Sequence, residues 1–176
     1  MIKGDNIYLR AMELSDCDIL YEIENNDETW RHGSYRAPYS KHIILNLIKR
    51  SIKYDIYTEK QLRLIICSNK TKEVIGYVDL YNFDPNNKRS AIGIYILSKH
   101  QRLGYAKEAL DLIIDYCFNV LLLKQVYSEI LENNIISIEL FKSKGFTECA
   151  FHKCWLNING KWENQYTFQL INKNII

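Results

Sequence analysis

The sequence predicts a mixed α/β domain of the α+β kind, with about four helices packed on one central, twisted, mostly antiparallel sheet of about seven strands. The order of elements along the chain carries this prediction, because it is β-α-α-β-β-β-α-β-α-β-β. Antiparallel hairpins come first and strand–helix–strand units follow. No linker, low-complexity segment or internal repeat interrupts the chain, and its 176 residues are enough for one core. We therefore expect a single domain over residues 1–176.

The elements of the first half follow from changes in hydrophobic period. Residues 6–10 alternate between apolar and polar side chains, as a short strand does. Helices are predicted after the capping residues 15–18 and after Ser40, because apolar residues then recur at helical spacing. The period next changes to two, which predicts a hairpin of strands 61–67 and 73–83.

Strands alternate with helices in the second half. The predicted elements are strand 89–97, a helix from about Tyr105 to residue 118, strand 124–131, helix 135–144 ended by Gly145, and strands 146–155 and 161–170. An Asn159–Gly160 pair lies between the last two strands and is typical of a tight hairpin turn. The strand–helix–strand unit around Tyr105 should form a right-handed crossover.

Composition limits the classes of partner. The formal net charge is +2, from 23 basic and 21 acidic residues, which argues against nucleic acid or an anionic membrane surface as the main partner. No apolar run approaches the ~20 residues of a membrane span, and the N-terminus lacks a secretory hydrophobic region. The five cysteines form no CxxC pair and no His/Cys cluster. We expect a cytoplasmic protein with reduced thiols and no metal.

The junction between strand 89–97 and the helix after it carries the clearest functional signal. The first backbone N–H groups of a helix lack partners and the helix dipole is positive there, so the junction is an anion site. Gly104 and Ala106 keep the loop low enough for a phosphate to approach the backbone. The loop is not a Walker motif, since the Gly-Lys-Ser/Thr ending is missing, and it is not a Rossmann fingerprint.

The spacing Gln101-x-x-Gly104-x-Ala106 resembles the pyrophosphate loop of the GNAT superfamily of N-acetyltransferases. Residues 108–110 (EAL) and a second motif, N-x-x-S-x-x-L-F-x-x-K-G-F over residues 134–146, resemble the same family. Residues 159–162, with their flanking strands, look like the branch that contains spermidine/diamine and ribosomal-protein N-terminal acetyltransferases. The resemblance covers about residues 5–171.

The resemblance implies that acetyl-coenzyme A (acetyl-CoA) binds between two parallel strands that splay apart, here 89–97 and 124–131. The acetyl-pantetheine arm would pair with the strand backbone as an added strand. The implied cofactor-binding residues are Ile94, Ile96, Leu97, Gln101, Arg102, Leu103, Gly104, Tyr105, Ala106, Asn134, Ser137 and Phe141.

Two positions depart from the family's catalytic pattern. Acetyl transfer needs a neutral amine, and deprotonating an alkylamine of pKa about 10.4 costs roughly 4 to 5 kcal/mol at pH 7. Many members carry a glutamate ten residues before the Gln and a tyrosine after the Leu of the second motif, where this chain has Ala91 and Phe141. We therefore expect a base from elsewhere, directly or through water, and a thiolate that leaves unaided or with help from Ser137.

Asp79 is the first candidate for the base or for an anchor of the amine, because it is an acid inside an apolar strand beside the cofactor strand. The alternative is a solvated or salt-bridged aspartate. Glu28 is a candidate to hold a cationic amine. Trp30, Tyr35 and Tyr39 either wall the acceptor pocket or pack under the loop.

These residues indicate an acetyl-CoA-dependent N-acetyltransferase, in which a bound primary amine attacks directly without a covalent enzyme intermediate. A small polyamine or diamine is the leading acceptor, although Arg36 would repel a polycation. A protein or peptide N-terminus, an aminoglycoside or an amino sugar would also satisfy the geometry. A non-catalytic acyl-CoA-binding sensor is the alternative from another class. The hydrophobic C-terminal strands suggest a homodimer edge.

Overall fold

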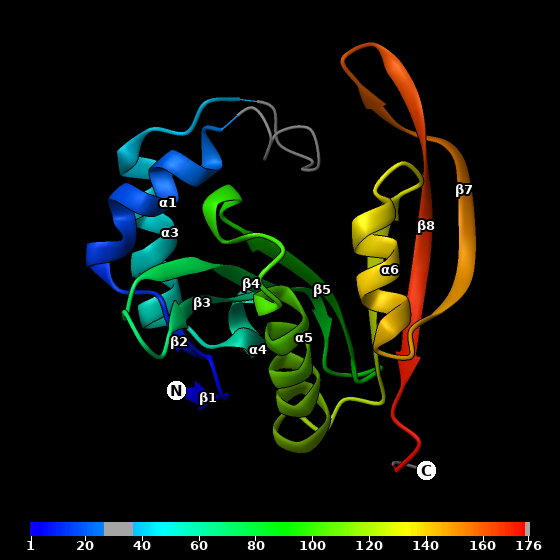
Figure 1. Ribbon diagram of the computed structural model, residues 1–176, viewed down its shortest axis with the longest axis horizontal. Coiled ribbons are helices and arrows are strands. Elements are labelled where there is room, and N and C mark those ends of the chain that lie inside the picture. Colours follow the sequence, from blue (N-terminus) through cyan, green and yellow to red (C-terminus); the bar gives the residue numbers. More distant parts are fainter. Residues whose placement is uncertain (27–36, 175–176) are drawn as a thin grey trace.

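The computed structural model describes residues 1–26 and 37–174. Its centre is one eight-stranded sheet of order β1-β2-β3-β4-β5-β6-β8-β7 (Figure 1). The strands are β1 (Ile2–Lys3), β2 (Ile7–Ala11), β3 (Leu62–Ser68), β4 (Val74–Asp84), β5 (Arg89–Ile96), β6 (Gln125–Leu131), β7 (Thr147–Ile158) and β8 (Lys161–Ile171). The helices are α1 (Cys17–Glu24), α3 (Lys41–Lys53), α4 (Ile56–Glu59), α5 (Tyr105–Asp115) and α6 (Ile135–Ser143).

Neighbouring strands are antiparallel except for β5 and β6. These two run parallel and are paired only from Arg89 with Gln125 to Ala91 with Tyr127. Beyond that pair the two strands have no register partners in each other, although β5 continues to Ile96. The expected splay between two parallel strands is therefore confirmed, and its apex lies at Ala91.

Helices cover both faces of the sheet and bury two hydrophobic clusters (Figure 1). Helices α5 and α6 lie over one face, where Leu110 and Phe141 join the larger cluster. Helices α1 and α3 lie over the other face, where Leu20 and Ile48 join the smaller cluster. Each buried stripe follows from apolar residues at helical spacing. Strands β7 and β8 form a long hairpin whose tip projects beyond the helices (Figure 1).

Most predicted elements are confirmed, and the differences concern short or irregular segments. The sheet has eight strands, not seven, because the two-residue strand β1 adds an edge through Ile2 opposite Leu9. The one-turn helix α4 was not predicted; the Asp55 side chain caps it by accepting a hydrogen bond from the Thr58 N–H at 2.9 Å. Helix α5 ends at Asp115 and a π-helical turn, Tyr116–Val120, continues it.

The hairpin turn between β7 and β8 is confirmed in its detail. Asn159 and Gly160 both have positive φ angles, 52° and 85°, as a type I′ turn requires. Among the described residues, no helix is long and apolar enough to cross a membrane, and no three metal-ligating side chains cluster.

Candidate active site

The loop before α5 presents free backbone donors at the mouth of the splay. Arg102 and Gly104 have φ angles of 62° and 86°, and this left-handed backbone turns the chain into the helix. The hydrogen bonds of α5 begin with Lys107 and Glu108, whose N–H groups both donate to the Gly104 carbonyl at 3.1 and 3.2 Å. The N–H groups of residues 102–106 have no acceptor in the described part of the chain. They are thus available to an anion.

The room around this loop fits a phosphate. A Cβ atom built on Gly104 would meet nothing within 4 Å, so a ligand can approach the backbone there. The Gln101 amide Nε2 donates to the Ile96 carbonyl at 3.1 Å and ties the loop to the end of β5. Gln101, Arg102 and Leu103 are exposed, whereas Tyr105 and Ala106 are half-buried. A helix N-terminus with free N–H groups and positive dipole is the expected cradle for a diphosphate.

The strand leading to the loop has one open edge. The Leu97 N–H donates to the Ile75 carbonyl at 2.9 Å, and Ile94 and Ile96 are in register with β4. Because β5 and β6 separate after Ala91, the other edge of β5 has no strand neighbour along Ile94 and Ile96. This edge fits the added strand that a pantetheine arm would form.

Helix α6 begins shortly after the end of the splayed strand β6. The Asn134 side chain caps the helix, with its Oδ1 accepting from the Ser137 N–H at 3.2 Å. Ser137 is half-buried in the first turn. Phe141 is buried and packs edge-on against Phe146, with ring centroids 5.0 Å apart, which leaves it little surface for a ligand. The cofactor-binding roles predicted for Asn134, Ser137 and Phe141, and the catalytic role predicted for Ser137, stay predictions.

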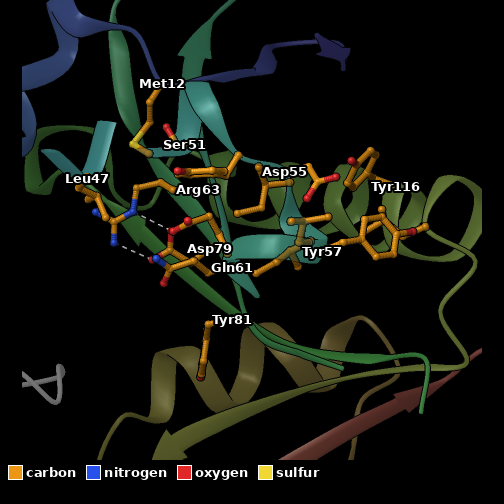
Figure 2. Close-up of a pocket in the computed structure, with 16 residues that line it drawn as sticks. Met12, Leu47, Ser51, Asp55, Tyr57, Gln61, Arg63, Asp79, Tyr81 and Tyr116 are labelled. Carbon is orange, nitrogen blue, oxygen red and sulfur yellow. Dashed lines mark hydrogen bonds and ion pairs between the residues drawn. The ribbon is translucent and has the colours of Figure 1, made fainter. Parts of the chain in front are cut away.

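Asp79 lies in an ion-pair network on the α1/α3 face of β4. Arg63 donates from Nε and Nη2 to the two Asp79 oxygens at 2.7 Å each (Figure 2). Its Nη1 donates to Glu24 of α1. The guanidinium also lies 3.8 Å from the centroid of the Tyr77 ring. Burial opposes the charge of Arg63, but Asp79, Tyr77 and Glu24 outweigh it and raise its pKa.

Both Asp79 oxygens are therefore already occupied by a permanent cation. Of the alternatives given for Asp79, the salt-bridged aspartate matches its contacts. A carboxylate held in this way suits an anchor for the amine better than a proton acceptor. Arg63 was not singled out from the sequence. The side chains of Arg63, Glu24 and Asp79 remain 16%, 15% and 24% exposed, so the network borders open space.

A cavity of about 410 Å³ adjoins this network (Figure 2). It lies between α3, α4 and the ends of β3 and β4. The charged and aromatic residues of its described lining are Asp55, Glu59 and Asp79, one basic residue, Arg63, and Tyr54, Tyr57, Tyr81 and Tyr116. Such a lining combines carboxylates with aromatic faces, both of which attract organic cations.

Tyr81 of β4 and Glu129 of β6 come from the two strands that flank β5 at the apex of the splay. Neither residue was predicted from the sequence as part of the site. Burial and the Glu129 carboxylate are the main causes that raise the pKa of Tyr81, so the two side chains are neighbours. A Cβ atom on Gly93 would lie 3.5 Å from Tyr81 Cε1, which shows that the ring crosses β5 at this glycine.

The remaining predicted acceptor residues divide into two groups. Tyr39 is half-buried and packs against the α1/α3 cluster, while its backbone N–H donates to Asn25 Oδ1 at 2.8 Å. Glu28, Trp30 and Tyr35 lie outside the described residues.

Comparison with known proteins identifies the family. The family model of the acetyltransferase (GNAT) domain matches residues 6–147. The chain belongs to this family. It is 26% identical to YjcK, a probable N-acetyltransferase of Bacillus subtilis, over 177 residues that cover 98% of this chain and 97% of the relative. The match to the spermidine N(1)-acetyltransferase of Vibrio cholerae is 23% identical over 161 residues, 92% of this chain and 90% of the relative.

Solved structures show the same GNAT fold. The spermidine N-acetyltransferase of Vibrio cholerae, in complex with CoA and spermine, superposes with a TM-score of 0.85 at 22% identity and covers 96% of each chain. A dodecameric structure of the Vibrio cholerae enzyme gives a TM-score of 0.81 at 22% identity, covering 96% of this chain and 95% of that one. The expectation of an acetyl-CoA-dependent N-acetyltransferase is confirmed at the level of the family.

Proposed function

We propose that this GNAT enzyme acetylates a primary amine of a small cationic acceptor, a polyamine or a diamine. The observation that carries the proposal is the described lining of the 410 Å³ cavity, which holds the acids Asp55, Glu59 and Asp79 and one basic residue, Arg63. Glu59 is also ion-paired at 2.9 Å with Arg50, which lies outside this lining. Arg63 pairs with both Asp79 and Glu24, so these three side chains together carry one net negative charge. A negative cavity attracts an ammonium group and repels an anionic acceptor.

The tyrosines of the cavity suit the same acceptor. Tyr57 packs edge-on against Phe83 at 5.2 Å between ring centroids, and this contact holds one aromatic wall in place. A methylene chain packs on such rings, and an ammonium is attracted to their faces. The match to an enzyme named spermidine N(1)-acetyltransferase supports the proposal from an independent direction.

The cofactor side has matching residues for acetyl-CoA. The N–H groups of residues 102–106 would hold the diphosphate, and the open edge of β5 at Ile94 and Ile96 would hold the pantetheine arm. When bound, acetyl-CoA supplies a thioester whose acetyl carbon the amine attacks directly. The protein holds the amine and the thioester close together in a suitable orientation, and this supplies a large part of the rate enhancement.

Two groups of this chain then act on the two reactants. Asp79 anchors the ammonium end of the acceptor through its partly exposed carboxylate. Ser137, in the first turn of α6, would donate a hydrogen bond to the leaving sulfur. A thiolate of pKa about 8.5 is in any case a tolerable leaving group.

An extended peptide amine is the second candidate, and one observation favours it. A shallow hollow of about 320 Å³ on β5, β6, β8 and β7 is lined by neutral hydrogen-bonding groups together with Arg89. Its polar lining residues include Gln125, Tyr127, Thr167 and Gln169. Amide and hydroxyl groups of this kind suit a peptide or sugar better than a polycation.

An amine panel tests the proposal. Release of free thiol from acetyl-CoA would be followed with spermidine, a diamine, a peptide with a free N-terminus, an aminoglycoside and an amino sugar. We expect the highest kcat/KM with the diamine or spermidine. A preference for the peptide would replace the proposed acceptor by the second candidate. Tight binding of acetyl-CoA in calorimetry without turnover of any amine would contradict an amine acetyltransferase and favour the sensor.

We also propose self-association of this chain, as expected from its C-terminal strands. The exposed aromatic residues Phe151, Trp155 and Trp162 lie on the β7–β8 hairpin, and β7 is an edge strand. Sedimentation velocity at several protein concentrations measures this directly, and a monomer at all of them would contradict it.

A further inference from the structure

The apex of the splay lacks a carboxylate on the strand where the family usually carries one. Ala91 stands at that position, and the next residue on the same face is Gly93. Their register partners on β4 are Tyr81 and Asp79. Asp79 is already bound by Arg63 through both oxygens. A proton acceptor for the amine must therefore come from another strand.

The Tyr81 side chain extends from β4 over β5, the strand that has Ala91 in place of the family's glutamate. A Cβ atom on Gly93 would lie 3.5 Å from Tyr81 Cε1 and 3.9 Å from Asp79 Cβ, so the ring lies over Gly93. A larger side chain at Gly93 would displace this ring. The small residues Ala91 and Gly93 thus leave the space that lets Tyr81 reach from β4 toward β6.

The Tyr81 side chain is directed toward Glu129 of β6, the strand on the other side of β5. Burial raises the pKa of Tyr81, and the carboxylate of Glu129 is the strongest of the charges that add to this effect, while the Glu129 backbone amide opposes it. This agrees with a ring that extends from β4 over Gly93 toward β6.

Glu129 occupies the splayed part of β6. It lies two residues beyond Tyr127, the last residue of β6 in register with β5, where it is paired with Ala91. Because Val126 and Ile130 belong to the cluster on the α5/α6 face, Glu129 points to the opposite face, as do Tyr127, Ala91 and Tyr81. Its side chain is exposed and forms no ion pair with any residue of 1–26 or 37–174.

We propose that Glu129 is the proton acceptor for the acceptor amine and that Tyr81 is the residue that positions it at the apex of the splay. The proposal rests on the function proposed above, since it assigns the base for that same reaction. Glu129 is suited to this role because its carboxylate is free, whereas that of Asp79 is held by Arg63.

The proton balance of the step is simple. The acceptor ammonium loses one proton to the Glu129 carboxylate, and the nitrogen lone pair then forms the N–C bond with the acetyl carbon. The C–S bond of the thioester breaks and its electron pair leaves on sulfur, which takes a proton from solvent. The second proton that the nitrogen loses on forming the amide also goes to solvent. Because the Glu129 side chain is exposed, it returns its proton to water after each turnover.

Several charged or polar groups lie around Tyr81 and Glu129. Asp79 from β4 and Tyr127 from β6 act on the Tyr81 hydroxyl together with Glu129. Across β8 the register partner of Glu129 is the uncharged Thr167, whose hydroxyl is 3.2 Å from His152 Nε2 on β7. Arg89 lines the hollow beside Tyr127.

Glu129→Gln tests the base, with Glu148→Gln as the matched control. Glu148 is an exposed acid on β7 whose register partner, Phe168, belongs to the core on the opposite face, so this variant also removes one charge. We expect E129Q to lower kcat/KM for the amine about 100-fold at pH 7. The deficit should shrink to about fivefold near pH 10, because the neutral amine is then abundant and no base is required.

Two readouts besides turnover separate a base from a structural residue. Calorimetry on the cofactor-free protein should show about fivefold weaker amine binding for E129Q and unchanged binding for E148Q. Coenzyme A affinity and the melting temperature should not change in either variant. Glu129→Asp, which keeps the carboxylate, should recover part of the activity at pH 7.

Tyr81→Phe tests the positioning residue, since it keeps the ring over Gly93 and removes only the hydroxyl. We expect about a tenfold loss in kcat with a wild-type melting temperature. An E129Q protein with near-normal turnover at pH 7, or one whose deficit is the same at every pH, would overturn the proposal. A wild-type protein that acetylates no amine would instead overturn the proposed function, and the assignment of the base would fall with it.

Discussion

The two sides of the splay are built from different chemistry. The cofactor side depends on backbone groups, namely the free N–H groups of residues 102–106 and the open edge of β5. The proposed acceptor side would depend on side chains that come from different elements, with Glu24 from α1, Arg63 from β3, Asp79 from β4 and Glu129 from β6.

This difference explains why the cofactor side can be shared among proteins with different acceptors, whereas the acceptor side is specific to one chain. Backbone donors recognise any ligand with the same diphosphate and amide groups, and they need only small residues and a helix start. Side chains gathered from four elements can change one at a time without disturbing the cofactor. Substitutions on one side should therefore leave ligand binding on the other side intact.

The largest expected effect is on stability and follows from removing Arg63. Arg63→Ala would remove the cation that the largely buried carboxylates of Glu24 and Asp79 share. We expect the free energy of unfolding to fall by about 3 kcal/mol, measured by urea denaturation. Lys41→Ala is the control, because its ion pair with Asp18 is 58% and 79% exposed and should be worth less than about 1 kcal/mol. Equal losses in the two variants would contradict a structural role for the network.

Asp79→Asn should have the next largest effect, confined to the acceptor. It preserves the shape of the side chain but removes one negative charge beside Arg63, so the cavity attracts an ammonium less strongly. We expect kcat/KM for the amine to fall about 30-fold, which corresponds to about 2 kcal/mol. Coenzyme A affinity in calorimetry should match the wild type. Near-normal turnover would remove Asp79 from acceptor recognition.

Most of the fold was predictable because its strands and helices have clear hydrophobic periods. The exceptions were elements too short to show one, such as β1, which exists through the pairing of Ile2 with Leu9, and α4, which spans one turn. The anion loop was also predictable, because Gln101, Gly104 and Ala106 act through local backbone.

The acceptor side was harder to predict, because its contacts cross between strands. The pairing of Arg63 with Asp79 depends on the register of the β3–β4 hairpin, and an irregularity at Ile66 and Cys67 shifts that register away from a simple count from the turn. Glu129 had an available signal. It is an acid in the second strand bordering the cofactor, so the reasoning that selected Asp79 applied to it equally.

The smallest expected effect tests the cofactor side through a matched pair of glycines. Gly104 and Gly160 have nearly equal φ angles, 86° and 85°, and an added Cβ would meet nothing within 4 Å at either. Gly104→Ala and Gly160→Ala should thus carry a similar backbone cost of about 1 kcal/mol. Only Gly104→Ala places its methyl group where a diphosphate would approach the backbone. We expect it to weaken coenzyme A binding in calorimetry about tenfold, or about 1.4 kcal/mol, while Gly160→Ala binds as the wild type does. If both variants lost affinity equally, backbone strain would explain the loss, and the free N–H groups of residues 102–106 would not be the diphosphate site.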